Sequence, residues 1–357
     1  MDAVPRLAVF CWVVASTAGA AAVGSATPVT ASAVPSATTA EVVFPPPPEP
    51  PRLRFLYAIA SPQDVSDPHP PFMRRVWNFM LGRKPDPNPA MARPYGVCAQ
   101  DGLIYAADTG GAAVVVFDRA HRRIRRLGGS VEGRLLSPIG VAVDPGGTIW
   151  VTDSAQNVVK VFGPTGGFLA QFGRAGEFLK PTGIAWDAAR HRFLVADTGH
   201  SRVVALDDTG RITLTFGGTG TGAGAMSSPV NLCIGPDGNI RVVDPILCKV
   251  QTFSPTGTFL SQFGAPGDTA GYFARPRGVA VDSDGNLYVA DALFNAVQVF
   301  DQAGKLLLVA GAPGSVPGAF DMPAGLFIDP ADRLYICDSM NRRIQVFQYL
   351  KLPATQR

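Results

Sequence analysis

The chain has 357 residues, of which 17% are charged, and it contains 39 glycines and 32 prolines. This composition predicts many turns and disfavours long helices. The formal net charge of +3 is too small to indicate a nucleic-acid or membrane partner by itself. Five cysteines occur without a C-x-x-C pair, so zinc ribbons, thioredoxin-like motifs and c-type haem attachment have no support.

The first residues have the pattern of a secretory signal peptide. An apolar run from Leu7 to Val14 follows Arg6, and Ala18 to Ala20 is a small-x-small cleavage pattern. We therefore expect residues 1–26 to be a signal peptide and the protein to be exported to the periplasm, the cell envelope or the extracellular space. The alternative is an uncleaved membrane anchor, although the apolar run is short for a span of about 20 residues.

A low-complexity segment follows the leader. Residues 27–51 are rich in Ala, Thr, Ser and Pro, and they end in a proline-rich run from Pro45 to Pro51. This segment lacks the apolar surface for a core, so we expect a disordered tether with partly polyproline structure. The folded domain is expected over residues 52–352, with a short tail at 353–357.

A sequence phrase recurs six times in the folded part, and its best copy runs from Arg275 to Asp291. The first marker is a proline, and successive copies lie 43 to 48 residues apart: Pro94, Pro138, Pro181, Pro229, Pro276 and Pro323. The second marker is an aspartate: Asp108, Asp153, Asp197, Asp244, Asp291 and Asp338. Such a period indicates a repeat architecture. Each copy reads as four short strands, a to d, so the sequence predicts an all-β, six-bladed β-propeller.

The repeated residues are expected to be structural. A glycine opens strand a beside the crowded channel, where a side chain would collide: Gly96, Gly140, Gly183, Gly278 and Gly325. The repeated aspartate can accept backbone N–H bonds in the loop that follows it. An aromatic residue in strand c is expected to pack between blades: Phe117, Phe162, Phe253, Phe300 and Phe347, with Leu206 in the third copy.

The two ends of the domain are expected to meet. The sixth copy has strands a, b and c but no clear strand d, while a spare strand at residues 52–60 precedes the first copy. We expect this N-terminal strand to complete blade six and to close the ring, which removes an open sheet edge.

One short helical insertion is expected between the closing strand and blade one, within residues 61–92. Residues 72–82 place Phe72, Val76, Trp77 and Met80 on one side at i, i+3, i+4 spacing, and Gly82 is a stop signal. We expect the apolar face, with Trp77, to pack on the propeller, and the alternative is that it docks a partner or a membrane surface.

These motifs resemble the NHL-repeat family over about residues 93 to 348. The family pattern, roughly Pro-x-Gly-Val-Ala-Val-Asp followed by Asp-Gly-Asn-Leu-Tyr-Val-Ala-Asp, is matched in this sequence from Pro276 to Asp291. The resemblance implies a binding disc first and an enzyme second, because such propellers include RNA-binding domains, extracytoplasmic sensor domains and a few enzymes.

The search for chemistry leaves no catalytic residue, no metal ligand and no cofactor. Only His200 of four histidines lies in a b–c loop, which is too few for a histidine-based metal site. Asn231 replaces the repeated glycine of strand a and is a candidate channel residue. The cysteines after the leader are expected to be small packing residues, with Cys248 open to exposure and a disulfide not indicated: Cys98, Cys233, Cys248 and Cys337.

Departures from the repeat gather on the face formed by the d–a and b–c loops. The candidate binding residues on this face are mostly basic: Arg93, Tyr95, Lys180, His200, Arg202, Asn231, Arg275, Arg277, Arg342 and Arg343, with Trp77 of the insertion. We expect an exported, non-catalytic binding or scaffold propeller whose partner is another envelope or extracellular protein, or an anionic ligand. The alternatives are a metal-dependent lyase or hydrolase acting at the channel mouth and a nucleic-acid-binding propeller, which export disfavours.

Overall fold

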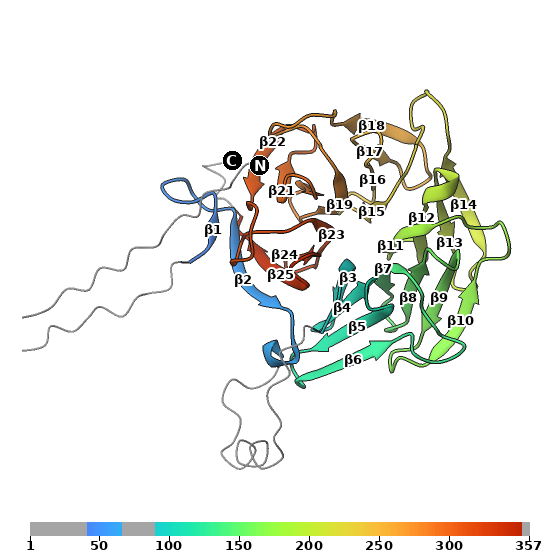
Figure 1. Ribbon diagram of the computed structural model, residues 1–357. Coiled ribbons are helices and arrows are strands. Elements are labelled where there is room, and N and C mark those ends of the chain that lie inside the picture. The colour runs from blue at the N-terminus through green and yellow to red at the C-terminus, as the bar shows by residue number, and fades with distance from the viewer. Residues whose placement is uncertain (1–40, 66–89, 352–357) are drawn as a thin grey trace, which may run out of the picture. The chain divides into compact units, whose positions relative to one another are not determined.

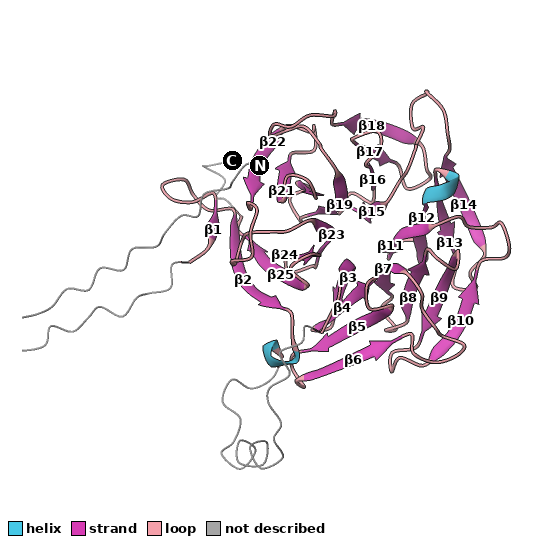
Figure 2. Ribbon diagram, viewed as in Figure 1, coloured by secondary structure: helices cyan, strands magenta, loops and turns pink. Residues whose placement is uncertain are grey.

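A computed structural model describes residues 41–65 and 90–351 of the chain. The expected signal peptide, the first part of the tether, the predicted helix at 72–82 with Trp77, and the tail at 353–357 lie outside the described residues. Within the described ranges helix is limited to two short 3-10 turns, η1 (Pro62–Asp64) and η2 (Thr198–His200) (Figure 2). Neither of these two turns has the length and apolarity needed to cross a bilayer.

The described strands form six antiparallel sheets that surround a central axis like the blades of a propeller (Figure 1). Strand a of each blade is innermost: β3 (Pro94–Gln100), β7 (Pro138–Val143), β11 (Pro181–Asp187), β15 (Asn231–Ile234), β19 (Pro276–Val281) and β23 (Pro323–Ile328). Strand b follows: β4 (Leu103–Asp108), β8 (Ile149–Asp153), β12 (Arg192–Asp197), β16 (Ile240–Asp244), β20 (Leu287–Asp291) and β24 (Arg333–Asp338). The six-bladed, all-β prediction is therefore confirmed.

The two outer positions of each blade are filled in the same order. Strand c is β5 (Ala113–Asp118), β9 (Val158–Phe162), β13 (Arg202–Leu206), β17 (Lys249–Phe253), β21 (Ala296–Phe300) and β25 (Arg343–Tyr349). Strand d is β6 (Arg123–Leu127), β10 (Phe168–Phe172), β14 (Ile212–Gly217), β18 (Phe259–Phe263) and β22 (Leu306–Ala310) in the first five blades.

Blade six takes its outer strand from the other end of the chain. β2 (Leu53–Ile59) pairs antiparallel with β25, from Leu53 opposite Tyr349 to Ile59 opposite Ile344. This pairing confirms the predicted closure of the ring by an N-terminal strand. A further short strand, β1 (Val43–Phe44), pairs with β2 and makes this sheet five-stranded. The structure therefore differs from the expected tether at residues 43–44, which belong to the blade because the side chain of Phe44 packs against Phe347.

The repeated glycines pack the inner strands against one another. A Cβ atom on Gly96 would lie 2.3 Å from the carbonyl oxygen of Ile139 in the next blade, and one on Gly278 would lie 2.2 Å from that of Ala324. Real side chains cannot approach backbone so closely, so glycine is required where neighbouring blades touch. The glycine level is thus the narrow part of the channel.

The repeated aspartates are fully buried and bind the loops beside them. Asp291 accepts hydrogen bonds from the backbone N–H groups of Ala274 and Arg275, which precede strand a, and from Leu293 and Phe294, which follow strand b. The sequence predicted only the second pair of bonds. A carboxylate with four backbone donors is used to fix loops.

A hydroxyl after several of these aspartates joins neighbouring blades. Thr109 donates to the carbonyl of Pro138 at 2.7 Å, and Ser339 donates to that of Pro94 at 2.6 Å across the closure between blades six and one. Ser154 and Thr198 make the same contact in blades two and three. Blades four and five have Pro245 and Ala292 at this position, so their following strands lack this contact. The sequence analysis missed this pattern.

Hydrophobic clusters lie between adjacent blades. The strand-c residues expected to pack there are at most 1% exposed: Phe117, Phe162, Leu206, Phe253, Phe300 and Phe347. For example, Phe117 of blade one shares a cluster with Ile59 and Ile344 of blade six. Burying an aromatic ring of this size contributes roughly 2–3 kcal/mol before conformational entropy is counted.

Candidate functional site

The axial channel of the propeller holds a cavity. A cavity of about 760 Å³ is lined by strand a of all six blades and by turns between strands a and b, including Asp101, Pro236, Ser283 and Ala331. It therefore opens on the face that carries the a–b turns. The basic candidate residues of the sequence lie on the opposite face. A cavity made by six separate strands leaves no local sequence motif.

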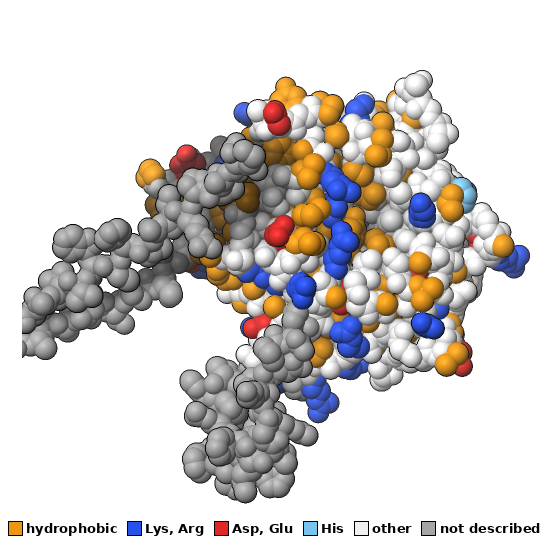
Figure 3. Space-filling view, in the orientation of Figure 1, with side chains coloured by type: hydrophobic (Ala, Val, Ile, Leu, Met, Phe, Trp, Pro, Cys, Tyr) orange, Lys and Arg blue, Asp and Glu red, His pale blue; other side chains and the backbone are white. Residues whose placement is uncertain are grey.

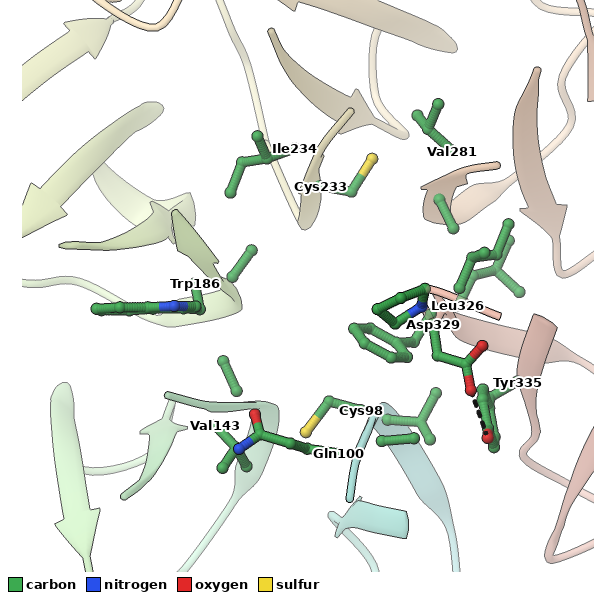
Figure 4. A pocket seen from close by; sticks show the side chains of 18 of the residues that line it. Cys98, Gln100, Val143, Trp186, Cys233, Ile234, Val281, Leu326, Asp329 and Tyr335 are labelled. Carbon is green, nitrogen blue, oxygen red and sulfur yellow. Dashed lines mark hydrogen bonds between the residues drawn. The ribbon is translucent and has the colours of Figure 1, made fainter. Parts of the chain in front are cut away.

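Apolar side chains make up most of the cavity wall. Val143, Ile234, Val281 and Leu326 stand around it, and Gln100, Asp329 and Tyr335 are among its polar side chains (Figure 4). The Gln100 amide donates to the carbonyl of Asp144 at 2.7 Å. A cavity with apolar walls and few polar groups is typical of small-molecule sites.

Asn231 lines this cavity in the place where other blades have glycine. It is half-buried, and within residues 41–65 and 90–351 no hydrogen bond engages its side-chain amide. A Cβ on Gly183 would lie 2.7 Å from the Asn231 Cα atom, so Asn231 is held tightly against blade three. The structure thus gives the cavity a free amide that can both donate and accept a hydrogen bond.

Two of the carboxylates that line the cavity, those of Asp282 and Asp329, are engaged by hydrogen bonds. Asp329 accepts hydrogen bonds from the Tyr335 hydroxyl at 3.1 Å (Figure 4) and from Arg333 Nε at 2.7 Å. Asp282 accepts from Tyr288 at 2.9 Å and from both nitrogens of Asn286. Both aspartates thus fix the a–b turns and are not free to bind a cation.

The cysteines near the channel are protonated packing residues. Burial raises the pKa of the Cys233 thiol to about 12, and it raises the pKa of the Cys98 thiol further. None of Cys98, Cys233, Cys248 and Cys337 forms a disulfide. Cys248, which the sequence left open to exposure, is buried, and its thiol lies 3.4 Å from the Pro245 carbonyl.

On the opposite face, formed by the d–a and b–c loops, several candidate residues are used structurally. His200 Nδ1 lies 2.7 Å from Asp197 Oδ2, and Arg202 Nε donates to the same oxygen at 2.8 Å. Arg202 also donates to the Glu177 carbonyl at 2.7 Å. These two side chains brace the junction of blade three.

Arg343 has the same structural use in blade six. Its Nε donates to Asp338 at 2.7 Å, and its two Nη atoms donate to the carbonyls of Ser315, Val316 and Ala319. The guanidinium therefore ties strand c to the d–a loop. These three carbonyls lie 24 to 28 residues away in sequence, so the repeat pattern alone did not indicate this role.

The remaining basic candidates are exposed at the rim of this face: Arg93, Lys180, Arg275 and Arg342. Lysine and arginine side chains form a band across the middle of the molecule in the space-filling view (Figure 3). Figures 2 and 3 show the molecule from the same side, and the turn η2, which belongs to a b–c loop, lies on the side that faces the viewer. The backbone amides of Arg93 and Arg275 are held by Asp108 and Asp291 at 2.7 and 3.0 Å, which fixes where their side chains emerge.

Arg277 and Tyr95 lie further in, at the second position of strand a in blades five and one. Arg277 is 6% exposed, and its guanidinium carbon lies 5.7 Å from the centroid of the Tyr95 ring. Burial raises the pKa of the Tyr95 hydroxyl, which the nearby Arg277, Arg275 and Arg93 charges oppose. The structure therefore brings four predicted residues together at the channel mouth and leaves Lys180, His200, Arg202, Arg342 and Arg343 outside this group.

No cluster of three or more His, Cys, Asp or Glu side chains able to hold a metal ion occurs within the described ranges.

A sequence model of the NHL repeat family matches this chain over residues 135–162 and 273–300. These segments run from the d–a loop through strand c of blades two and five. No curated protein sequence matches the chain significantly.

Solved structures share the fold. An auxiliary nutrient binding protein from Bacteroides thetaiotaomicron is 12% identical with a TM-score of 0.59, and the alignment covers 75% of this chain and 71% of that one. Virginiamycin B lyase from Staphylococcus aureus is 12% identical with a TM-score of 0.54, covering 72% and 96%. A chain of a nidogen/laminin complex is 20% identical with a TM-score of 0.50, covering 61% and 80%. Identities this low show a shared fold only.

Proposed function

Because the chain is an NHL-repeat β-propeller of six blades, we propose that it is an exported binding protein that holds a small ligand in its axial cavity. The observation that carries the proposal is the cavity of about 760 Å³ with the unengaged amide of Asn231 in its wall. Small-molecule sites are cavities of roughly 300–1,000 Å³ in which a few polar groups orient the ligand.

The lining indicates the class of ligand. Valine, isoleucine and leucine side chains favour an apolar body, and Asn231 offers one donor and one acceptor. The ligand is therefore a mostly apolar molecule with a hydrogen-bonding group such as a hydroxyl, amide or lactone. A charged group is disfavoured here, because Asp282 and Asp329 are committed to the turns.

The described polar groups support binding over catalysis. The nucleophile candidates at the cavity are thiols held protonated by burial, and the aspartates are engaged by turn donors. Metal-dependent lyase or hydrolase chemistry is the alternative, and His200 is its nearest support, but this side chain braces Asp197 on the other face.

Export is proposed from the leader. The uncharged apolar run and the small residues near Ala20 predict cleavage within about residues 21 to 27. Mass spectrometry of the native protein should find a new N-terminus in that range on a protein outside the cytoplasm. A soluble cytoplasmic protein with its original N-terminus would contradict export.

The binding role is tested by identifying small molecules that remain bound to the protein during purification. Protein purified from its native host is denatured, and the released small molecules are compared by mass spectrometry between the wild type and Asn231→Gly. This variant restores the residue of the repeat, so the fold should persist while the ligand is released at a lower yield or not retained. Val309→Trp, on outer strand β22, is the control that should retain the ligand.

Two results would contradict the role. The first is a wild-type protein that releases no small molecule and shows no thermal shift with apolar compounds. The second is equal retention in the wild type, in Asn231→Gly and in Val143→Trp, which fills the cavity wall.

A further inference from the structure

One arginine at the opposite mouth of the channel is buried without a hydrogen-bond or ion-pair partner for its guanidinium within the described residues. Arg277 is 6% exposed, and its Nη1 atom is buried without a hydrogen-bond acceptor. No hydrogen bond or ion pair of its guanidinium occurs within residues 41–65 and 90–351. A buried, uncompensated charge is costly to a folded protein, so it calls for an explanation.

The position of Arg277 shows that the repeat does not require the charge. The second residue of strand a is neutral in the other five blades: Tyr95, Ile139, Thr182, Val230 and Ala324. Packing at this level is therefore satisfied by apolar or small polar side chains. Arg277 is an addition specific to blade five.

The carboxylate near Arg277 is already in use. Asp291 is fully buried and accepts four backbone hydrogen bonds, from Ala274, Arg275, Leu293 and Phe294. The arrangement contrasts with Arg343, whose Nε reaches the equivalent carboxylate of Asp338. In blade five, Arg277 therefore forms no ion pair with the Asp291 carboxylate.

An aromatic ring and two like charges lie near Arg277. The guanidinium carbon lies 5.7 Å from the centroid of the Tyr95 ring, which is a cation–π contact. Burial lowers the pKa of Arg277, and the like charges of Arg275 and Arg93 also lower it, whereas Tyr95 and the Asp291 carboxylate oppose this shift. The mouth therefore combines the Arg277–Tyr95 pair with two further arginines. A guanidinium binds planar or tetrahedral oxyanions through paired N–H donors.

We propose that Arg277, with Tyr95, Arg275 and Arg93, forms an oxyanion-binding site at the mouth of the channel on the d–a face. The site takes a small multivalent oxyanion, or a carboxylate, phosphate or sulfate group of a larger ligand. Arg277 supplies the buried contact, and the two exposed arginines raise the local potential. The proposal does not rest on the apolar cavity at the other end of the channel, and either site can exist without the other.

The test is titration calorimetry of the purified full-length protein with sodium citrate, sodium phosphate and sodium sulfate, at constant ionic strength set with sodium chloride. The three arms separate a carboxylate preference from a phosphate or sulfate preference. We expect saturable binding of at least one of them with one site per chain. Arg277→Met should weaken that binding at least tenfold, and Arg275→Met and Arg93→Met a few-fold each.

Arg342→Met is the matched control, because it removes an exposed arginine from the same face outside the cluster. It should leave the dissociation constant within twofold of the wild type. Equal weakening by Arg277→Met and Arg342→Met would show diffuse surface charge and overturn the site, as would the absence of saturable binding by the wild type. Should Arg277→Met fail to fold, Arg277→Lys keeps the charge without the planar fork, and unchanged binding by that variant would also overturn the geometry proposed.

Discussion

At the start of strand b in blade four and at the channel mouth in blade five, the propeller buries an arginine to nearly the same depth. Arg241 is 4% exposed and Arg277 is 6% exposed. Arg241 Nη2 donates to Asp237 at 2.7 Å, and Nη1 donates to the second oxygen of the same carboxylate, so only its Nε lacks a partner. Arg277 has no such carboxylate in the described structure. The two arginines are thus equally buried, but only Arg241 is neutralised by a carboxylate. Arg241 holds a turn, whereas the Arg277 guanidinium is available to a ligand.

The largest effect is expected from removing the partner of the neutralised arginine. Asp237→Ala leaves Arg241 buried with an unpaired charge, which should lower the free energy of unfolding by about 2–3 kcal/mol, less than for a fully buried pair because Asp237 is 42% exposed. Chemical denaturation measures the change. Asp208→Ala, at an exposed c–d turn, is the control and should stay within about 0.5 kcal/mol. Equal stability of both variants would remove the contrast between the two arginines.

Removing the neutralised arginine itself should cost less. Arg241→Met leaves Asp237 partly in water, so the remaining charge stays solvated, and the loss should be about 1–2 kcal/mol. The same denaturation experiment measures it. A loss larger than that of Asp237→Ala would mean that packing of the arginine stem, and not charge pairing, holds this turn.

Acid should weaken the pair at blade four in a defined window. The hydrogen bond from Arg241 lowers the pKa of Asp237 to about 2. A lowered folded-state pKa stabilises the protein above the unfolded value of about 4, and this contribution is lost as pH falls from about 4 to about 2. The stability difference between the wild type and Asp237→Asn should therefore narrow in that window, by about 1 kcal/mol or less given the exposure of Asp237. A difference that widens on acidification would contradict the assignment.

The smallest effect on stability is expected at the channel mouth. Arg277→Met removes a charge that has the Tyr95 ring beside it but no hydrogen-bond or ion-pair partner among the described residues, so the unfolding free energy should stay within about 0.5 kcal/mol of the wild type or rise. Thermal and chemical denaturation without added oxyanions measure this. A loss of about 2 kcal/mol or more would place Arg277 with Arg241 among the structural arginines.

The fold could be predicted because the same sequence motif occurs once in each blade. The proline and aspartate markers identify six copies of the repeat. The predicted strand at residues 52–60 corresponds to β2, which takes the position of the missing strand d in blade six. The extra strand β1 was missed because Val43 and Phe44 precede a proline-rich run and have no counterpart in the repeat.

The candidate site could be predicted only in part. The sequence placed Arg277 and Arg343 on the same face, but it did not separate them, because the acceptors of Arg343 are carbonyls of a distant loop. The apolar cavity also escaped, because its wall takes a few residues from each of six strands. The signal that was present for Arg277 is a charged residue at a repeat position that is neutral in the other five blades.

The account is tested most directly by locating an oxyanion in the protein. Crystals of the protein grown with selenate provide an anomalous signal from selenium, and the anomalous difference map shows where this tetrahedral oxyanion binds. We predict a peak within hydrogen-bond distance of the Arg277 guanidinium and close to the Arg275 side chain. A map with peaks at exposed groups such as Lys180 or Arg342 and none at Arg277 would contradict it, as would a carboxylate of the chain itself bound to that guanidinium.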